Sequence, residues 1–274
     1  MAERLAGKVA VITGASRGLG QYCALGYAAE GATVIVAARS SQEAGPGTVE
    51  MIRQAGGNAF AVSCDVGDPA SITGMVGTVL DRVGRIDLLM TNAAYFAPGT
   101  LSTIDMADWD RQFRVNVDGV FHAIRAVLPA MNAQGGGNII TVSSVAAQKA
   151  SHYGLTKRAV VGMTLGFAAE QRQNGIAVNA LRPVAAIRTP GWLASRDPAV
   201  LKTREHRVSP PDSYVEAAIL LGMRTADTCT GRELSDAEVI RLFGKPGDYE
   251  RFKTMNAQVW GDDAATRLAP GACG

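Results

Sequence analysis

The sequence predicts an α/β fold in which one doubly wound parallel sheet is covered by helices on both faces. Short runs rich in β-branched residues and ended by turn formers alternate with longer segments of helical spacing. This alternation repeats about six times, and right-handed crossovers then place helices on both faces of the sheet. The 274 residues are 47% hydrophobic, which suits one large Rossmann-like domain over residues 1–274.

Six apolar runs are typical of buried parallel strands, because they are nearly continuous rather than alternating. They are residues 8–14, 33–39, 58–65, 86–94, 138–144 and 176–183. Residues 230–244 predict a last edge strand and a turn, followed by a tail to Gly274. Ligands of a doubly wound sheet bind at the carboxyl ends of the strands, so we expect functional residues directly after these runs.

Four segments between the strands have helical spacing, and several of them end at a glycine, as helices often do. They are residues 19–31, 69–84, 106–131 and 151–175. The crossover that includes residues 40–49, "SSQEAGPGTV", leaves room for only a short helix. After Pro183 the pattern loosens over residues 183–213, a Pro- and charge-rich stretch. It is too long for an ordinary connection, so we predict a substrate lid there.

The composition limits the partners of the chain. A net charge of +2 with scattered Lys and Arg gives no basic stripe, so neither nucleic acid nor an anionic membrane is an expected partner. The four cysteines lie far apart, without a C-x-x-C motif or an adjacent His, which argues against a metal site or a disulfide framework. No signal peptide and no transmembrane run is expected. We expect a cytoplasmic protein with a small-molecule ligand.

The first predicted strand ends in a glycine-rich turn, "VITGASRGLGQ", with Gly14, Gly18 and Gly20 before a helix. Missing Cβ atoms let such a backbone approach a pyrophosphate, and the helix N-terminus offers free N–H groups. The spacing G-x-x-x-G-x-G differs from the common G-x-G-x-x-G dinucleotide motif. A tight turn without a ligand is the alternative, and the position between strand and helix favours dinucleotide binding.

Two arginines indicate which dinucleotide is bound. An Asp or Glu after the second strand would accept bonds from ribose hydroxyls, whereas arginine would bind a 2′-phosphate. Here the strand ends in Ala38 and Arg39, and Arg17 lies in the glycine turn. The pair favours NADP(H) over NAD(H), with two solvated surface arginines as the alternative. Asp65, after the third strand, is placed to bond an adenine amino group or to cap the next turn.

The chain resembles the short-chain dehydrogenase/reductase family over nearly its whole length. The matching landmarks, in family order, are "TGASRGLG" (13–20), "CDV" (64–66), "NAA" (92–94), Asn116, Ser144, "YGLTK" (153–157) and "NALRP" (179–183). Each is weak alone, and together they are specific. The resemblance implies a dinucleotide site formed by Gly14, Ser16, Arg17, Gly18, Leu19, Gly20, Arg39, Asp65, Val66, Asn92, Ala93, Tyr153, Lys157, Pro183 and Thr189.

The resemblance also implies a catalytic set. Tyr153 and Lys157, four residues apart, share one helix face. The lysine cation, together with the positive nicotinamide of the oxidised cofactor, is expected to favour the phenolate and to lower the pKa of Tyr153. Tyr153 would exchange a proton with the substrate oxygen, and Lys157 would also bind the nicotinamide ribose. Ser144, or Ser143 as the fallback, would hold that oxygen, and Asn116 would position a water that relays protons to the lysine. Ordinary packing and surface roles are the alternative for each residue.

Three departures from the family pattern concern the substrate side. Only eight residues separate Ser144 from Tyr153, where relatives have about twelve, so the pocket wall changes and the pocket is expected to be more open. Ala94 stands where the family usually has glycine. Val184 replaces the glycine that normally follows Pro183, and valine rarely adopts positive φ. The backbone toward Thr189, expected near the nicotinamide carboxamide, is then expected to run differently.

The predicted function is an NADP(H)-dependent oxidoreductase that interconverts a ketone or aldehyde and an alcohol by hydride transfer. The alternatives are an NAD(H)-dependent dehydrogenase of the same fold and a dinucleotide-binding sensor or scaffold without turnover. A homo-oligomer, tetramer or dimer, is expected from the resemblance. The substrate is expected to be of moderate size without a required charge, with candidate apolar walls and polar contacts at Trp192, Leu193, Tyr95, Phe96, Arg188, Arg196 and His206.

Overall fold

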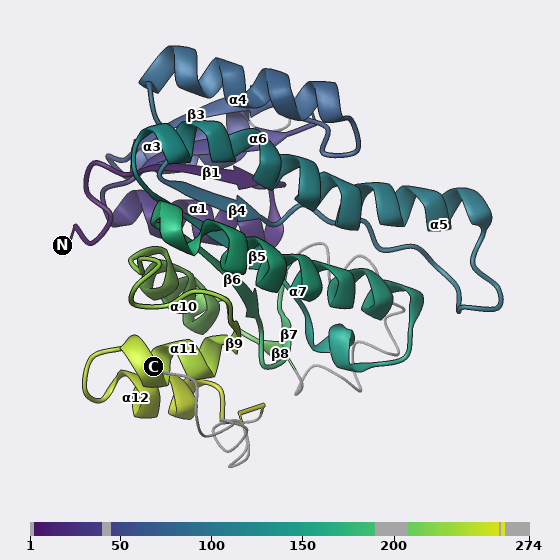
Figure 1. The fold of residues 1–274 in the computed structure, drawn as a ribbon. Helices are drawn as coiled ribbons and strands as arrows, with labels where there is room; N and C mark the ends of the chain where they lie inside the picture. The colour runs from purple at the N-terminus through teal and green to yellow at the C-terminus, as the bar shows by residue number, and fades with distance from the viewer. Residues whose placement is uncertain (1–2, 40–44, 190–207, 258, 261–274) are drawn as a thin grey trace.

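A seven-stranded parallel sheet forms the centre of the protein (Figure 1). The computed structural model describes residues 3–39, 45–189, 208–257 and 259–260. The strand order β3-β2-β1-β4-β5-β6-β9 reverses direction after β1, as a doubly wound sheet does. The predicted fold class is therefore confirmed. The strands are β1 (Val9–Thr13), β2 (Thr33–Ala38), β3 (Asn58–Ser63), β4 (Leu88–Thr91), β5 (Gly137–Val142), β6 (Ile176–Arg182) and β9 (Glu233–Ser235).

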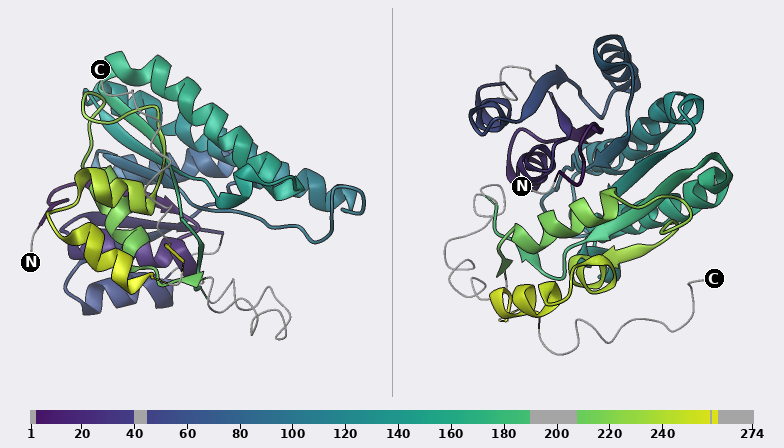
Figure 2. Two further views of the ribbon diagram at one scale, coloured as in Figure 1. Left: turned by 90° about the horizontal axis from the view of Figure 1, so that it is seen from below. Right: turned by 90° about the vertical axis from the view of Figure 1, so that its left-hand side faces the viewer.

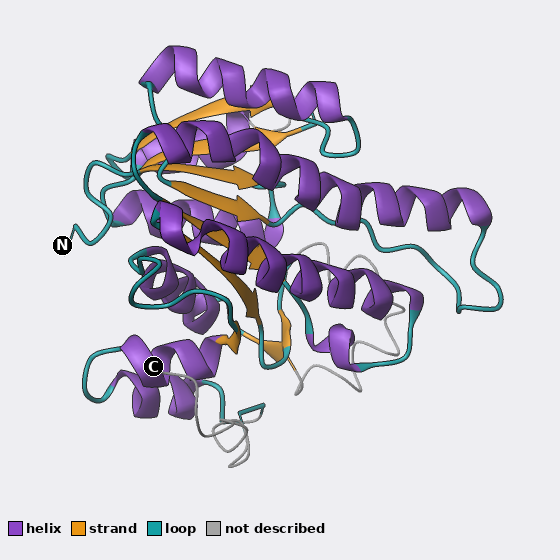
Figure 3. Ribbon diagram, viewed as in Figure 1, coloured by secondary structure: helices purple, strands orange, loops and turns teal. Residues whose placement is uncertain are grey.

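Helices cover both faces of the sheet (Figure 3). One face packs against α4 (Pro69–Val83), α6 (Gly119–Ala133) and α7 (His152–Gln171). The other packs against α1 (Gly18–Ala29), α10 (Asp212–Gly222) and α11 (Asp236–Phe243). Each layer has its own apolar core, because strands buried on both faces supply side chains to both sides. None of the described helices is long and apolar enough to cross a membrane.

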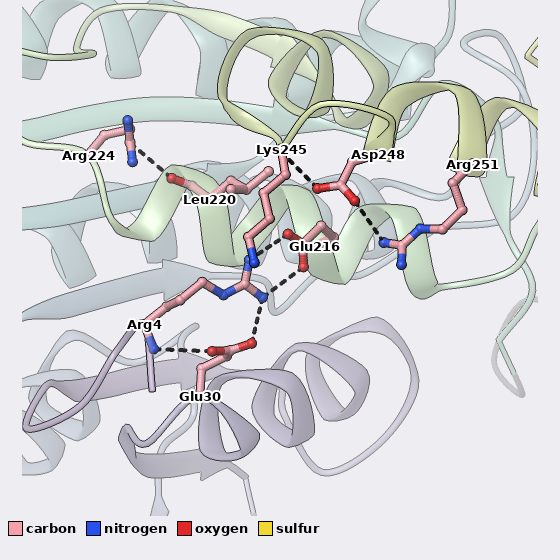
Figure 4. Close-up of polar contacts among 8 residues, drawn as sticks. All are labelled: Arg4, Glu30, Glu216, Leu220, Arg224, Lys245, Asp248 and Arg251. Carbon is pink, nitrogen blue, oxygen red and sulfur yellow. Dashed lines mark hydrogen bonds and ion pairs between the residues drawn. The ribbon is translucent and has the colours of Figure 1, made fainter. Parts of the chain in front are cut away.

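The first described residues are tied to two helices of one layer by ion pairs (Figure 4). The Arg4 guanidinium donates to Glu30, which follows α1, and to Glu216 on α10 at 2.9 Å. The Arg4 backbone N–H also donates to Glu30, at 3.1 Å. Arg4 is mostly buried and bonds both carboxylates, which raises the pKa of its guanidinium. Its two ion pairs are therefore stronger than fully exposed ones.

The second crossover is short, as predicted, and consists of a π-helical turn, Gly45–Val49, and α3 (Glu50–Gln54). The third helical segment begins with α5 (Met106–Phe113), continues through a π-helical turn, Arg114–Asp118, and merges into α6. Figure 2 shows this run extending well beyond the sheet. Because β4 and β5 are parallel neighbours, the loop from β4 to α5 and the loop from β5 to α7 lie at the same edge of the sheet. This edge holds the carboxyl ends of both strands.

The C-terminal prediction is correct for the strand and wrong for the residues after it. Within 230–244, β9 pairs with β6 as the expected edge strand. The expected turn is replaced by α11, and α12 (Asp248–Met255) lies within the expected tail, of which residues 258 and 261–274 lie outside the described residues. The cause is a capping box, in which Ser235 and Glu238 bond each other's backbone N–H groups at the start of α11. That pattern overrides the turn signals.

Most of the predicted lid, residues 190–207 of 183–213, lies outside the described residues, as do Trp192, Leu193, Arg196 and His206. The two ends of this segment pair with each other as short parallel strands, β7 (Ala186–Ile187) and β8 (Val208–Ser209). Both ends are thus fixed beside the carboxyl end of β6.

Candidate active site

A large cavity of about 1960 Å³ opens at the carboxyl ends of the strands. It exceeds the ~300–1,000 Å³ of most small-molecule pockets, which leaves room for a dinucleotide and a small substrate. The predicted site residues that line it are Gly14, Ser16, Arg17, Gly18, Leu19, Arg39, Asp65, Val66, Asn92, Ala93, Ser144, Tyr153, Lys157, Pro183 and Thr189. Gly20 and Asn116 do not line it and act from behind its wall.

The glycine turn passes so close to its neighbours that side chains are excluded. Gly14 has a φ of +66°, and a Cβ there would lie 2.8 Å from Ala93 Cα. A Cβ on Gly20 would overlap the Asn92 amide and lie 2.7 Å from Gly14 O. The helix α1 begins at Gly18 and has no side-chain cap at Arg17. Its first N–H groups consequently face the cavity, as anion binding requires.

Asn92 holds the glycine turn against β4. Its Nδ2 donates to Thr13 O at 2.9 Å and to Gly14 O at 3.1 Å. The Thr13 hydroxyl in turn accepts the backbone N–H groups of Asn92 and Ala93, both at 3.1 Å. Asn92 therefore acts on the backbone that surrounds the cavity, through bonds that pre-organise it.

The two arginines lie at the far end of the cavity. Arg17 and Arg39 are exposed, line the cavity, and make no side-chain bond to any described residue. Ser63 Oγ fixes the Arg39 backbone by donating to its carbonyl at 3.1 Å. Asp65 also lines this end, and its Oδ1 accepts the Gly67 N–H at 2.9 Å. Asp65 thus caps the next turn. The same bond fixes the orientation of its carboxylate group, including the second oxygen.

Tyr153 and Lys157 lie together on α7, as their spacing requires. The Lys157 Nζ is 5.7 Å from the centre of the Tyr153 ring and donates to Val142 O at 2.8 Å. Lys157 is only 2% exposed, and burial lowers its pKa to about 8. Burial raises the pKa of Tyr153 to about 12. The predicted lowering of the Tyr153 pKa combines Lys157 with the positive nicotinamide of the oxidised cofactor, so it stays a prediction for the protein with cofactor bound.

The two adjacent serines have different surroundings. Ser143 is buried, and its Oγ donates to Glu233 Oε1 at 2.8 Å, across the sheet on β9. Ser144 is partly exposed and lines the cavity. Its Oγ accepts the Ala146 N–H at 3.1 Å, which leaves its hydroxyl proton available to a ligand. This geometry favours Ser144 over Ser143 for contact with a substrate.

Asn116 is fully buried in the π-helical turn. Its Oδ1 accepts the Tyr95 N–H at 2.7 Å, and its Nδ2 donates to Tyr95 O at 2.8 Å and to the Thr156 hydroxyl at 3.3 Å. These bonds occupy the side-chain amide. Both N–H donors of the amide are used, so a water that Asn116 positions toward Lys157 would have to donate to Oδ1 or to the backbone carbonyl.

The shortened loop between Ser144 and Tyr153 forms a compact connection. Residues Val145–Gln148 form a 3-10 turn, and Ser151 caps α7 by accepting the Gly154 N–H at 3.0 Å. A Cβ on Gly154 would overlap Ala146 O, so the loop packs directly against the start of the helix. The loop itself is closely packed, and the more open substrate pocket expected from its shortness stays a prediction.

Val184 adopts an ordinary backbone conformation, because no described non-glycine residue has a positive φ. Its N–H donates to Asp236 Oδ1 at 2.8 Å, and Ser213 Oγ donates to the other carboxylate oxygen at 2.9 Å. Asp236 is fully buried, which raises its pKa to about 6. The helix α11, absent from the sequence prediction, thus supplies the residue that fixes the backbone after Pro183.

Four residues of the site were not identified from the sequence. Thr13, Gln112, His152 and Glu233 each bond a wall of the cavity or a residue beside it. Only His152, next to Tyr153, has a position that draws attention in the sequence. The other three act through contacts between distant segments, which leave no local pattern.

The site fits a dinucleotide without a metal. The Gly14 and Gly20 positions leave the space that a Cβ would fill, and Arg17 and Arg39 offer charge at one end. Among the described residues, no group of three His, Cys, Asp or Glu side chains is arranged to hold a metal ion. The described cysteines, Cys23, Cys64 and Cys229, are buried.

Comparisons with known proteins agree with this geometry. A family model described as short chain dehydrogenase matches residues 8–197. The short-chain reductase protein NovJ of Streptomyces niveus is 40% identical over 178 residues, covering 64% of this chain and 68% of the relative.

Two solved structures are similar over most of their length. A gluconate 5-dehydrogenase from Burkholderia cenocepacia J2315, in complex with NADP and tartrate, has a TM-score of 0.77 at 31% identity, covering 85% of this chain and 94% of that one. A 7α-hydroxysteroid dehydrogenase, complexed with NADH and 7-oxo glycochenodeoxycholic acid, has a TM-score of 0.78 at 30% identity, covering the same shares of the two chains.

Proposed function

The chain belongs to the short-chain dehydrogenase/reductase family of oxidoreductases that act on alcohols and carbonyls, and on that premise we propose an NADP(H)-dependent reductase in which Tyr153 is the general acid and base. A bound nicotinamide dinucleotide supplies or accepts the hydride. The observation that carries the proposal is the convergence of the glycine turn, Ser144, Tyr153 and Lys157 on one cavity.

Tyr153 suits the role of proton donor in carbonyl reduction. With a pKa of about 12, its phenol is protonated at neutral pH and donates its proton to the substrate oxygen as that oxygen gains negative charge. The Lys157 ammonium, behind the ring, stabilises the phenolate that is left. In alcohol oxidation the same pair acts in reverse, and further positive charge in the cavity is needed to lower the phenol pKa.

Ser144 donates its hydroxyl proton to the same substrate oxygen and so fixes the carbonyl beside Tyr153. Lys157 is held by Val142 O at 2.8 Å, which leaves two of its three N–H bonds for the cofactor ribose and for water. Asn116 and Thr156 brace α7 from behind. Each of these groups is already oriented in the protein, so little reorganisation is needed during the reaction.

The preference for NADP(H) over NAD(H) is supported by Arg17 and Arg39. Both line the same end of the cavity without a partner among the described residues, and guanidinium groups bind phosphate through paired hydrogen bonds. The related structures contain NADP in one case and NADH in the other. The preference of this chain for NADP(H) or NAD(H) therefore has to be inferred from its own arginines.

The catalytic part of the proposal is tested with Tyr153→Phe. We expect this variant to lose at least about a hundredfold in turnover of ketones and to keep its affinity for NADPH, because the ring is retained. Tyr22→Phe, on the outer side of α1, is the matched control and should keep full activity. A wild-type protein that binds a dinucleotide and turns over no ketone or alcohol would favour the sensor alternative.

The cofactor part is tested by titrating NADPH and NADH separately. Replacing Arg39 by Asp should weaken NADPH binding by about 10- to 100-fold, as expected for losing a charge-assisted hydrogen bond, and should leave NADH binding equal or stronger. The control is Arg172→Asp, an exposed arginine outside the cavity. Equal loss for both cofactors would contradict the preference for NADP(H).

A further inference from the structure

The first part of the β4–α5 loop, residues 95–99, is fixed to a helix by buried side chains. Asn116 bonds both the N–H and the carbonyl of Tyr95, at 2.7 and 2.8 Å. Two residues further on, Gln112 Oε1 accepts the Ala97 N–H at 2.9 Å. Gln112 and Asn116 are four residues apart on one helical run. Alternate residues of the loop therefore bond to successive turns of that run.

His152 completes this arrangement at the far end of the loop. Its Nε2 is 3.0 Å from Gly99 O, and its Nδ1 is 3.1 Å from Gln112 Nε2. Because Gly99 O can only accept, Nε2 donates to it. Nδ1 lies within hydrogen-bond distance of both Gln112 amide atoms, 3.1 Å from Nε2 and 3.3 Å from Oε1. His152 thus joins the loop to Gln112, and we call Asn116, Gln112 and His152 the amide ladder.

The amide ladder places Phe96 beside the reacting phenol. The ring of Phe96 lies edge-on to the Tyr153 ring, with centroids 5.2 Å apart and planes at 61°. Its backbone neighbours, Tyr95 and Ala97, are both bonded to the helix. Phe96 lines the cavity, yet 62% of it is exposed. A large apolar face is therefore presented to the cavity by a backbone that cannot easily move.

We propose that Phe96 is the specificity-determining residue of the substrate site, and that Gln112 and His152 are positioning residues that hold it. The preferred substrates are ketones, or the matching alcohols, with a flat uncharged ring attached to the reacting carbon. This inference rests on the proposed function. A ring attached there lies over Phe96 when the oxygen reaches Tyr153 and Ser144.

Other walls of the cavity give a ring room. Val145, Ala146, Val184, Ala185 and Ala186 line the same cavity and are apolar, while the charged side chains of Asp110, Arg111, Arg114 and Lys149 also line it. The apolar residues leave width for a ring beside Phe96. Aromatic pairs in edge-to-face or offset geometry are favourable beyond the area that they bury, and burying the exposed face of Phe96 adds the hydrophobic term.

The test compares two matched substrates, phenyl methyl ketone and isopropyl methyl ketone, in wild type and Phe96→Ala. We expect wild type to prefer the phenyl ketone in kcat/KM. Phe96→Ala should lower that preference about tenfold or more, and tenfold is the lower end of the discrimination that one apolar contact supplies. The change should lie mainly in KM for the phenyl ketone, because the lost contact is one of binding. Phe96→Leu, which keeps apolar volume, should lose less.

The positioning role is tested by a double-mutant cycle. Gln112→Met keeps the length of the side chain and removes both of its hydrogen bonds. It should lower the phenyl preference in wild type and have no further effect on it in Phe96→Ala, since Gln112 acts through Phe96. Gln134→Met, at the C-terminal end of α6, is the control for loss of glutamine hydrogen bonds away from the cavity, because its amide donates to Ile86 O and Gly136 O.

Two failures are distinguishable. If wild type reduces neither ketone and oxidises neither alcohol with either cofactor, the proposed function fails. If wild type reduces both, and Phe96→Ala keeps the wild-type preference, only this inference is overturned. An equal fall for both ketones in Gln112→Met, or a fall that persists in the Phe96→Ala background, would contradict the positioning role.

Discussion

The two ends of the cavity are built by different means. At the cofactor end, the wall is backbone, and close approach of Gly14 to Ala93 and of Gly20 to Asn92 leaves space that only glycine permits. At the substrate end, the wall is a loop held by the amide ladder, with bonds between residues up to 53 positions apart in the chain.

With the proposed function, this difference lets the cofactor end and the substrate end respond to substitution independently. A backbone cradle depends on glycines at a few fixed positions, and most substitutions there are harmful. A loop held by side chains can change its exposed residue, here Phe96, while the bonds to Tyr95 and Ala97 stay in place. We therefore expect substitutions at the two ends to have different effects, on cofactor binding and stability at one end and on specificity at the other.

The largest effect is expected at the cofactor end, from Gly14→Ala. The new Cβ would lie 2.8 Å from Ala93 Cα at a φ of +66°. Left-handed backbone and a backbone clash together should lower the free energy of unfolding by about 3 kcal/mol and weaken dinucleotide binding by more than about a hundredfold, since a shifted turn misplaces the free N–H groups. Urea unfolding and cofactor titration measure the two effects.

Gly74→Ala is the matched control for that substitution. Gly74 lies on the exposed side of α4, with nothing within 4 Å of its added Cβ. Alanine should therefore stabilise the helix there by about 0.5–1 kcal/mol. A Gly14→Ala protein with normal stability and normal cofactor affinity would show that the cradle tolerates side chains, and the contrast between the two ends would disappear.

The sequence predicts the cofactor end better than the substrate end for the same reason. A glycine turn between a strand and a helix is a local pattern, and Gly14, Gly18 and Gly20 are found from their spacing alone. The i, i+4 spacing of Tyr153 and Lys157 is likewise local. The bonds from Gln112 and His152 to the loop depend on how α5 meets α7, which no spacing reports. The raised pKa of Tyr153 also depends on burial, which the sequence does not show.

The next largest effect is expected at Ser143 and Ser144, the two serines that lie where the cofactor end and the substrate end of the cavity meet. Ser144→Ala should lower kcat about a hundredfold, the usual cost of losing one donor to the reacting oxygen. Ser143→Ala should lower the free energy of unfolding by about 1–2 kcal/mol, because it leaves the Glu233 carboxylate without its hydrogen bond, with a much smaller effect on kcat. Steady-state kinetics and urea unfolding of both variants separate the roles.

Ser144→Thr serves as the control, because it keeps the hydroxyl and the bond to the Ala146 N–H. It should recover most of the activity that Ser144→Ala loses. A reversed result, with Ser143→Ala inactive and Ser144→Ala active, would move the substrate oxygen toward the sheet and away from Phe96.

The smallest effect is expected at Asp236, which fixes Val184 between the two ends. Its folded pKa, about 6, is raised above the ordinary carboxyl value of 3.8, so the folded protein holds this proton to higher pH than the unfolded chain. Stability from this group is therefore present at low pH and falls as pH rises through the folded pKa, by about 1 kcal/mol between pH 5 and 7.

Asp236→Asn should remove that part of the pH dependence, because the amide keeps both bonds, accepting from Val184 and donating to Ser213. Urea unfolding of wild type and variant at pH 5 and 7 measures the difference between the two slopes. At pH 7 the variant should be at least as stable as wild type, since no buried charge needs desolvation. A variant that is as pH-dependent as wild type would show that Asp236 does not supply this pH dependence. A variant clearly less stable at pH 7 would mean that the carboxylate charge itself holds Val184, and that the boundary between the two ends depends on electrostatics more than on hydrogen-bond geometry.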